Sequence, residues 1–355
     1  MGLVAFTTSR DELLAASAGE LTGLEACEVV ARAVNRVAPY DAGALMTTDP
    51  ETHLPAGGVV SGFEPTACAT FWDNELLDPD FNKFNDLVKR VEPLATLVDA
   101  TDGEIERSPR HQKLYAAFGG TDELRVAFMA GATCLAIGAF VRCGGSFTTT
   151  ETADVRNLLV PAVEVLRRGL VCCESPVEHG PVVILLDEHQ NVVSQSEGTD
   201  EVLDDLRIDV DGVIPTTILV AASRARAGRS SGRFTTRLRG RSGRWVRLHV
   251  APMDGPGGLV AITLDRATPS DLMPILLDSY GLTPRETEVV LAMCRGLATK
   301  EIASEFGISS HTVRDHLKIV FAKTDVNSRG ELVARLFTDH VIDTFEERVM
   351  TLSTP

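Results

Sequence analysis

Three charged residues near the C-terminus, Arg314, Asp315 and Lys318, lie within about one helical turn of one another. The apolar residues around them recur at helical spacing on the opposite side: Val313, Leu317, Val320 and Phe321. The sequence therefore predicts a helix over 311–323 that packs through one face and presents hydrogen-bonding groups on the other. Such groups can contact base edges in the major groove of DNA, which an α-helix is able to enter.

This helix is the third of three predicted helices, and with the second it forms a helix-turn-helix pattern. Thr283-Pro284-Arg285-Glu286 predicts a helix start in which the Thr hydroxyl and the Glu carboxylate form a capping box. A second helix begins near Thr299, and Gly307 can take the positive φ that a tight turn between helices needs. The hydroxyls of Ser309 and Ser310 then cap the third helix. Since the three helices bury apolar stripes against one another, the polar face of the third stays open.

Residues 282–337 closely resemble the LuxR-type helix-turn-helix domain of bacterial transcription regulators. The resemblance is carried by LTPRE, KEIA, GIS, TVRDHL and SRGEL, the last of which opens a fourth helix. It implies an all-α four-helix domain over 281–340 that binds double-stranded DNA and reads bases from the positions of Arg314, Asp315 and Lys318. The resemblance places a further set near DNA phosphates: Thr299, Lys300, Ser309, Ser310, Thr312, His316, Lys323 and Arg329.

Three positions stand out against the family pattern. Ile319 stands where the family more often has a polar residue, and Thr324 where it more often has Leu, so we expect the helix end to pack differently. Asp315 would either accept a hydrogen bond from a cytosine N4 or select against wrong sites by repulsion. The alternative interpretation is a three-helix core that contacts protein instead of DNA.

Length and composition predict a multidomain globular protein. With 355 residues, 44% hydrophobic and 24% charged, the chain suits two or three domains. No apolar run approaches the length of a membrane span, and residues 1–14 lack a basic region before a hydrophobic stretch, so we expect a cytoplasmic protein with no membrane partner. Seven cysteines without zinc-ligand spacing fit a reduced compartment and no metal site.

The net charge of −16 is unevenly distributed. Residues 1–175 carry 14 Lys and Arg against 25 Asp and Glu, whereas residues 311–329 carry four basic side chains against two acidic ones. Because affinity from phosphate contacts grows with the number of charges neutralised, one copy of so modest a patch should bind DNA weakly. We therefore expect a homodimer on two half-sites, with RNA polymerase as a further partner of such a regulator.

The order of predicted elements in residues 1–175 resembles a GAF domain, a small-molecule sensor fold. Helical sequence over 11–38 is followed by a hairpin over 42–61, a helical insert and a second hairpin over 124–141. The segment FTTTE then caps a long helix that ends at Leu170.

A GAF domain has a cavity between its sheet and its helical insert, and this resemblance implies where a ligand would bind. We place an unidentified small-molecule effector near Phe71, Trp72 and Phe118. The alternative is that these aromatic residues are ordinary core.

Residues 176–266 resemble a PAS domain. A hairpin over 181–195, a helix over 214–226 and three later strands predict a second antiparallel sheet. Alternation along the strand over 244–251 turns three residues outward: Trp245, Arg247 and His249.

Nine arginines and no acidic residue occur between residues 212 and 253. Arg237, Arg239 and Arg241 fall on one strand face, and we predict that they form a ridge on the solvent side. The ridge either keeps a sheet edge soluble, or docks on the acidic residues 1–175 or on phosphates.

Other functions lack the residues that they require. No Gly-x-x-x-x-Gly-Lys-Ser/Thr motif is present, and the chain does not open with the strand and paired acids of a phosphoryl-accepting receiver domain. His53, His111, His179 and His189 stand alone, without metal-ligand or triad spacing. The adjacent Cys172 and Cys173 are expected to pack at a helix end, and the alternative is a redox or metal role. We therefore expect neither an enzyme nor a bound cofactor.

The sequence as a whole predicts a multidomain α+β transcription regulator. GAF-like and PAS-like antiparallel-sheet sensor domains are followed by a linker over 267–280, the all-α DNA-binding domain and a tail over 341–355. A small molecule or interdomain packing would adjust DNA binding. The alternative is a scaffold whose sensor-like domains only dimerise, with constitutive DNA binding. A preformed apolar cavity would favour the first interpretation, and a filled core the second.

Overall fold

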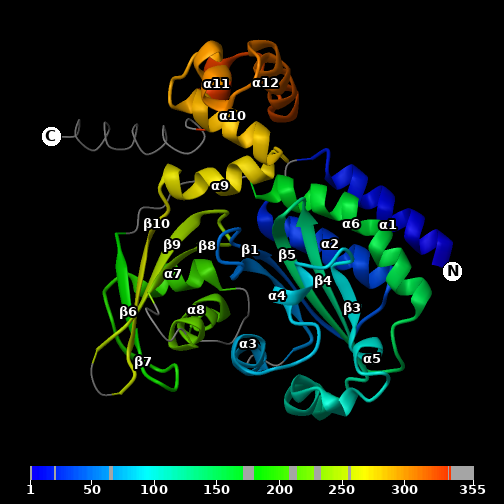
Figure 1. Cartoon of the computed structure of the whole chain (residues 1–355). Helices are drawn as coiled ribbons and strands as arrows, with labels where there is room; N and C mark the ends of the chain where they lie inside the picture. The colour runs from blue at the N-terminus through cyan, green and yellow to red at the C-terminus, as the bar shows by residue number, and fades with distance from the viewer. Residues whose placement is uncertain are drawn as a thin grey trace. The chain divides into compact units, whose positions relative to one another are not determined.

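The computed structural model describes residues 2–19, 21–63, 67–170, 180–207, 214–227, 233–254, 257–334 and 336. They form a larger unit, Met1–Ala267, and a smaller unit, Thr268–Pro355, each with its own core (Figure 1). The predicted tail and the Cys172–Cys173 pair lie outside the described residues. Within the described ranges, no helix is both long and apolar enough to cross a membrane.

The first sheet of the larger unit has five antiparallel strands in the order β2-β1-β5-β4-β3. Its strands are β1 (Ala42–Thr48), β2 (Pro55–Ser61), β3 (Leu94–Thr96), β4 (Asp122–Ala130) and β5 (Thr133–Arg142). Both predicted hairpins are present, and β3 adds an edge. Most residues of β4 and β5 are buried, because helices cover both faces of the sheet.

One face of this sheet carries α1 (Gly2–Ala16), α2 (Gly23–Val37) and α6 (Thr149–Gly169), which pack on one another (Figure 1). Thr22 and Glu25 form a capping box that starts α2, so the helical stretch predicted over 11–38 is two helices. The opposite face carries the insert: α3 (Ala67–Leu77), α4 (Phe84–Leu87), α5 (Leu97–Ala100), the 3₁₀ turns η1 (Ile105–Arg107) and η3 (Ala116–Phe118), and the π turn η2 (His111–Tyr115).

The second sheet is also antiparallel, with the order β7-β6-β10-β9-β8. The two sheets confirm the α+β class. The strands are β6 (Val182–Leu186), β7 (Val192–Gln195), β8 (Phe234–Arg239), β9 (Trp245–Pro252) and β10 (Val260–Arg266). Its inner face packs on α7 (Thr199–Leu206), which the sequence analysis did not predict, and on α8 (Thr216–Ala227).

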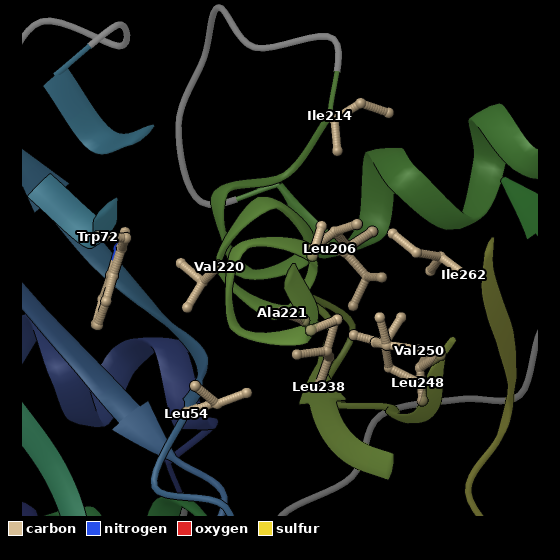
Figure 2. Close-up of a cluster of buried hydrophobic side chains, with 14 of the residues drawn as sticks. Leu54, Trp72, Leu206, Ile214, Val220, Ala221, Leu238, Leu248, Val250 and Ile262 are labelled. Carbon is tan, nitrogen blue, oxygen red and sulfur yellow. The ribbon is translucent and has the colours of Figure 1, made fainter. Parts of the chain in front are cut away.

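The two sheets share one hydrophobic core, with α8 between them. Figure 2 shows Val220 of α8 on the side of Trp72, while Ala221 lies toward Leu238 and Leu248 of the second sheet. Packing of α8 against α3 joins the insert to the second sheet. The larger unit is therefore held together by buried apolar contacts across its whole width.

The prediction of a solvent-exposed arginine ridge is wrong for Arg237 and Arg239. For Arg237 the alternative prediction, docking on acidic residues of 1–175, is confirmed. Arg237 is only 7% exposed because the β1–β2 turn covers it, and its guanidinium pairs with Asp49 at 2.9 Å and Glu51 at 2.8 Å. Asp49 is fully buried. We call these three residues the Arg237 clasp. Arg241 alone is exposed as predicted.

Arg239 and Trp245 are the other corrections on this sheet. Arg239 is buried and donates to the carbonyl oxygens of Gly169 and Gly243, and its guanidinium lies 5.5 Å from the ring centre of Trp245. Trp245, predicted to face outward, is 4% exposed. Close approach of β2 to β8 needs a glycine, since a Cβ at Gly57 would lie 2.8 Å from the Arg239 carbonyl oxygen.

The smaller unit contains α9 (Pro269–Ser279), α10 (Pro284–Cys294), α11 (Thr299–Phe306) and α12 (Ser310–Thr324), and residues 329–334 are helical. The segment predicted as a linker thus contains the helix α9. Ser328 and Glu331 start the last helix, because the Glu331 N–H donates to the Ser328 hydroxyl and the Asn327 N–H donates to the Glu331 carboxylate.

Candidate DNA-binding interface

The core of the smaller unit forms because α10, α11 and α12 each bury one apolar stripe. Thr283 and Glu286 make the predicted capping box at the start of α10, with Pro284 in its first turn. The buried residues include Val289, Val290, Met293, Ile302, Ala303, Val313, Leu317 and Val320. This packing fixes which side of α12 faces outward.

The turn between α11 and α12 has the predicted glycine and a serine cap, but Ser310, predicted to cap the helix as well, is the first residue of α12. Gly307 ends α11 in the left-handed conformation with φ of 64°, and the Ile308 N–H donates to the Ala303 carbonyl oxygen at 3.0 Å. Ser309 is the N-cap of α12, and its hydroxyl oxygen accepts from the Thr312 N–H at 3.0 Å. These bonds fix the direction in which α12 leaves the turn.

The three predicted base-reading residues lie together on the outward side of α12. Arg314, Asp315 and Lys318 are all exposed. Asp315 is paired along the helix with His311, whose Nδ1 lies 2.9 Å from an Asp315 carboxylate oxygen. The outward side therefore presents two cations and an acid, and that acid already has a local partner.

The predicted phosphate-binding residues do not form one set. Lys300 is exposed on the first turn of α11, and Ser309 is exposed at the α12 cap. Four others are half-buried: Thr299, Ser310, Thr312 and His316. The Thr312 hydroxyl lies 2.9 Å from the Ser309 hydroxyl, so the two oxygens form one polar patch at the N-terminus of α12. A helix N-terminus favours anions such as phosphate.

Lys323 and Arg329 make contacts inside the domain. The Lys323 Nζ donates to the Glu286 carboxylate at 2.7 Å and to the Gly281 carbonyl oxygen at 3.0 Å. Arg329 donates to the Leu297 carbonyl oxygen and to the Thr299 hydroxyl, both at 3.2 Å. Each cation therefore joins segments that are distant in sequence, a role that helical spacing cannot predict.

The Glu286–Lys323 pair links the end of α12 to the start of α10. Partial burial raises the pKa of Glu286, but the hydrogen bond from Lys323 and the bonds at the α10 cap outweigh it and hold the pKa below its usual value. The carboxylate serves both as the second half of a capping box and as the partner of Lys323.

The two departures from the family pattern have different environments. Thr324 is 1% exposed, and its hydroxyl donates to the Val320 carbonyl oxygen at 2.8 Å, so the end of α12 is packed with its polar group satisfied. Ile319 is 45% exposed on the outward side.

The larger unit contains a cavity of about 40 Å³ between the first sheet and the insert. Phe71 and Trp72, two of the predicted pocket residues, line it together with other residues that are almost all apolar. Phe118, the third, lies one layer further out: it is 40% exposed and packs edge-on against Phe63, which does line the cavity.

A buried ionic network adjoins the cavity and was not predicted from the sequence. The guanidinium of Arg125 lies 5.1 Å from the ring centre of Phe71 and 4.5 Å from that of Phe84, and both rings line the cavity. Arg125 pairs with Glu75 of α3 at 2.6 Å and with Glu123 at 2.9 Å. The network therefore ties the insert to the sheet beside the cavity.

Glu123 is the centre of this network. It also pairs with the fully buried Arg110 at 2.6 Å and accepts from the Tyr115 hydroxyl at 2.7 Å. Burial raises the pKa of Glu123, but Arg110 and Arg125 outweigh burial and lower the pKa to about 2. In the part of the chain that the structure describes, no group of three or more His, Cys, Asp or Glu residues is arranged to hold a metal ion.

The C-terminal domain is similar to a known family and to known regulatory proteins. Residues 280–336 match the family described as bacterial regulatory proteins, luxR family. The monoamine regulon transcriptional regulator of Klebsiella aerogenes is 46% identical over 54 residues, which cover 15% of this chain and 24% of that protein. The transcriptional regulatory protein DesR of Bacillus subtilis is 43% identical over 54 residues, 15% of this chain and 27% of DesR. The matched segment thus spans only about a quarter of these relatives.

Two solved structures are similar at a greater distance. SdiA in complex with octanoyl-rac-glycerol is 12% identical with a TM-score of 0.35, over 94% of this chain and 95% of SdiA. The Vibrio cholera VqmA–ligand–DNA complex is 18% identical with a TM-score of 0.23, over 45% of this chain and 82% of VqmA. Likenesses this weak carry no argument about fold or ligand. The conclusion that stands is that residues 280–336 form a LuxR-type helix-turn-helix domain, a DNA-binding domain of bacterial transcription regulators.

Proposed function

We propose that the whole chain is a cytoplasmic, homodimeric, sequence-specific transcription regulator that places α12 in the major groove of double-stranded DNA. The observation that carries this proposal is the exposed polar face of α12 in a domain that matches the luxR family. RNA polymerase would be the partner through which such a regulator acts.

In this proposal the two charge types on α12 have separate roles. Arg314 and Lys318 donate to base acceptors, and Asp315 accepts from a base amine. Lys300, with the polar patch at the α12 N-terminus, holds phosphates and sets the register of the helix on the duplex. Lys323 and Arg329 keep their contacts inside the domain.

The test is base specificity at one salt concentration. DNA sites are first selected from a random pool with the full chain. Arg314→Ala and Lys318→Ala are then each expected to weaken binding to the selected site by roughly 1–3 kcal/mol, with a much smaller loss on scrambled DNA. Arg295→Ala is the matched control, because Arg295 is exposed in the same domain but pairs with Glu305 on α11. Equal losses on both DNAs would mean that Arg314 and Lys318 hold phosphates only.

We further infer that the larger unit senses a small molecule, with its sheets acting as GAF-like and PAS-like folds. The apolar cavity supports this. At about 40 Å³ it has room for only a few water-sized groups, so a larger ligand needs the half-buried rings of Phe63 and Phe71 to move outward.

A route from the cavity to the second sheet runs through α3. This helix carries Phe71 and Trp72, which line the cavity, and its Asp73 accepts from the Ser223 hydroxyl of α8 at 2.9 Å. Because α8 also packs in the core of the second sheet, movement of α3 would be passed on to that sheet.

Benzene is an apolar probe that is larger than the cavity, so its binding also requires the rings of Phe63 and Phe71 to move outward. Saturating benzene is expected to raise the melting temperature of the wild-type chain, and much less that of Ala139→Val, whose added methyl groups fill the space. Affinity for the selected site is measured with and without benzene for both proteins. If benzene changes neither the melting temperature nor the DNA affinity of the wild-type chain, the ligand-independent scaffold becomes the better interpretation. The proposal of DNA binding would still stand in that case.

A further inference from the structure

Ile319 is an apolar residue in the middle of the charged outward face of α12. Asp315, Lys318, Ile319 and Ala322 follow the spacing i, i+3, i+4 and i+7, which places them on a single helix face. Ile319 is 45% exposed and is not among the residues that pack on the core of the domain. The fold therefore does not explain why an isoleucine stands there.

The surface around Ile319 is hollowed. A shallow hollow is lined by Asp315, Lys318, Ile319, Ala322 and Lys323. Ala322 is small and exposed, so one turn beyond Ile319 the helix backbone is open to close approach. The hollow thus combines a carboxylate, an ammonium group and an apolar side chain within reach of one another.

This combination matches the major-groove edge of an A·T base pair. Thymine presents its O4 acceptor beside its C5-methyl group, and adenine presents a donor amine next to them. The Lys318 ammonium group complements the O4 acceptor, and the Ile319 side chain complements the methyl group. The Asp315 carboxylate complements the adenine amine. The C5-methyl is also the one apolar feature that distinguishes bases in the major groove, and it is read by apolar contact.

We propose that Ile319 is a specificity residue that reads the C5-methyl of a thymine in each half-site, next to bases contacted by Lys318 and Asp315. This assignment rests on the proposed DNA-binding function and adds a base preference to it. It accounts for an apolar residue on a DNA-facing surface whose other members are charged or small.

Deoxyuridine tests the assignment because it differs from thymidine only in lacking that methyl group. The site selected by the full chain is resynthesised with each thymidine replaced by deoxyuridine, one position at a time. At one thymidine position of each half-site, the replacement should lower the affinity of the wild-type chain for the site about threefold to tenfold. This is the loss expected for one buried methyl group. Deoxyuridine at the other positions should leave affinity unchanged.

The variant Ile319→Ala completes a double-mutant cycle. It should weaken binding to the thymidine site, and deoxyuridine at the sensitive position should then cause no further loss. Leu291→Ala is the matched control, because Leu291 is 42% exposed on α10 and lies outside the outward face of α12. The control should keep the full response to deoxyuridine.

Three results would overturn the proposal. The wild type could be indifferent to deoxyuridine at every position, or Ile319→Ala could keep the full deoxyuridine response. Alternatively, Ile319→Ala could shift sedimentation of the DNA-free chain from dimer to monomer, which would place Ile319 between two copies. In each of these cases, the recovery of a specific site by selection would still support the proposed DNA-binding function. If selection yields no specific sequence, the proposed function fails as well.

Discussion

Glu123 has a strongly lowered pKa, and this predicts how the larger unit responds to acid. Its pKa in the folded chain is about 2, against an ordinary value of 4.5. A lowered folded pKa contributes stability that is complete above the ordinary value and is lost as the pH falls toward 2. We expect the free energy of unfolding, measured with urea, to drop by about 3 kcal/mol from this group between pH 5 and pH 2.

Glu123→Gln provides the control for that assignment. The variant should already be less stable at pH 7 by about 3–5 kcal/mol, since Arg110 and Arg125 lose their shared partner. Its stability should also depend less on pH below 5. An unchanged pH dependence would show that other carboxylates dominate acid unfolding.

Lys323 provides a second prediction at the level of single residues. Lys323→Met keeps the aliphatic stem but leaves Glu286 without its ammonium partner, so we expect the smaller unit to lose about 1–2 kcal/mol of stability. The dependence of DNA affinity on salt should stay the same. Lys300→Met should instead leave stability unchanged and lower the salt slope by about one. The opposite pattern would return Lys323 to the phosphate-binding set.

The Arg237 clasp joins the first sheet to the second, so breaking it should destabilise the larger unit. Arg237→Leu leaves the buried Asp49 carboxylate without its cation and should cost about 3–5 kcal/mol. Arg241→Leu, four residues along the chain at an exposed position, should change stability by no more than about 0.5 kcal/mol. Thermal unfolding of the larger unit, followed by circular dichroism, makes the comparison. Equal melting temperatures for the two variants would mean that the clasp contributes nothing.

Local chemistry made α10, α11 and α12 predictable. Capping residues, a glycine at the turn and apolar periodicity all act within a few residues, and Thr283, Gly307 and Ser309 each have the predicted role. The outward position of Arg314 and Lys318 follows from the same periodicity. These features therefore needed no knowledge of the distant chain.

Contacts with distant segments of the chain explain why the predicted exposure of Arg237, Arg239 and Trp245 is wrong. Strand alternation correctly puts Arg237, Arg239 and Trp245 on the face opposite Leu238 and Leu248, but it cannot tell whether another part of the chain covers that face. Here the β1–β2 turn and the end of α6 do so.

At the scale of the whole chain, the larger and the smaller unit differ in charge and each has its own core. The larger unit is acidic, with residues 1–175 carrying a net −11, so it does not add to attraction for phosphates. The smaller unit has its own hydrophobic core, so we expect it to fold as a separate fragment. We therefore assign dimerisation to the larger unit, as part of the proposed function.

This division predicts that fragment 268–355 binds an inverted repeat of the selected half-site about 10²- to 10⁴-fold more weakly than the full chain. In a dimer, binding of the first domain holds the second at a high effective concentration beside the other half-site. On DNA with one half-site this advantage disappears, so fragment and full chain should bind with similar affinity. Sedimentation of the full chain as a monomer at micromolar concentration, or equal affinities for the inverted repeat, would contradict the assignment.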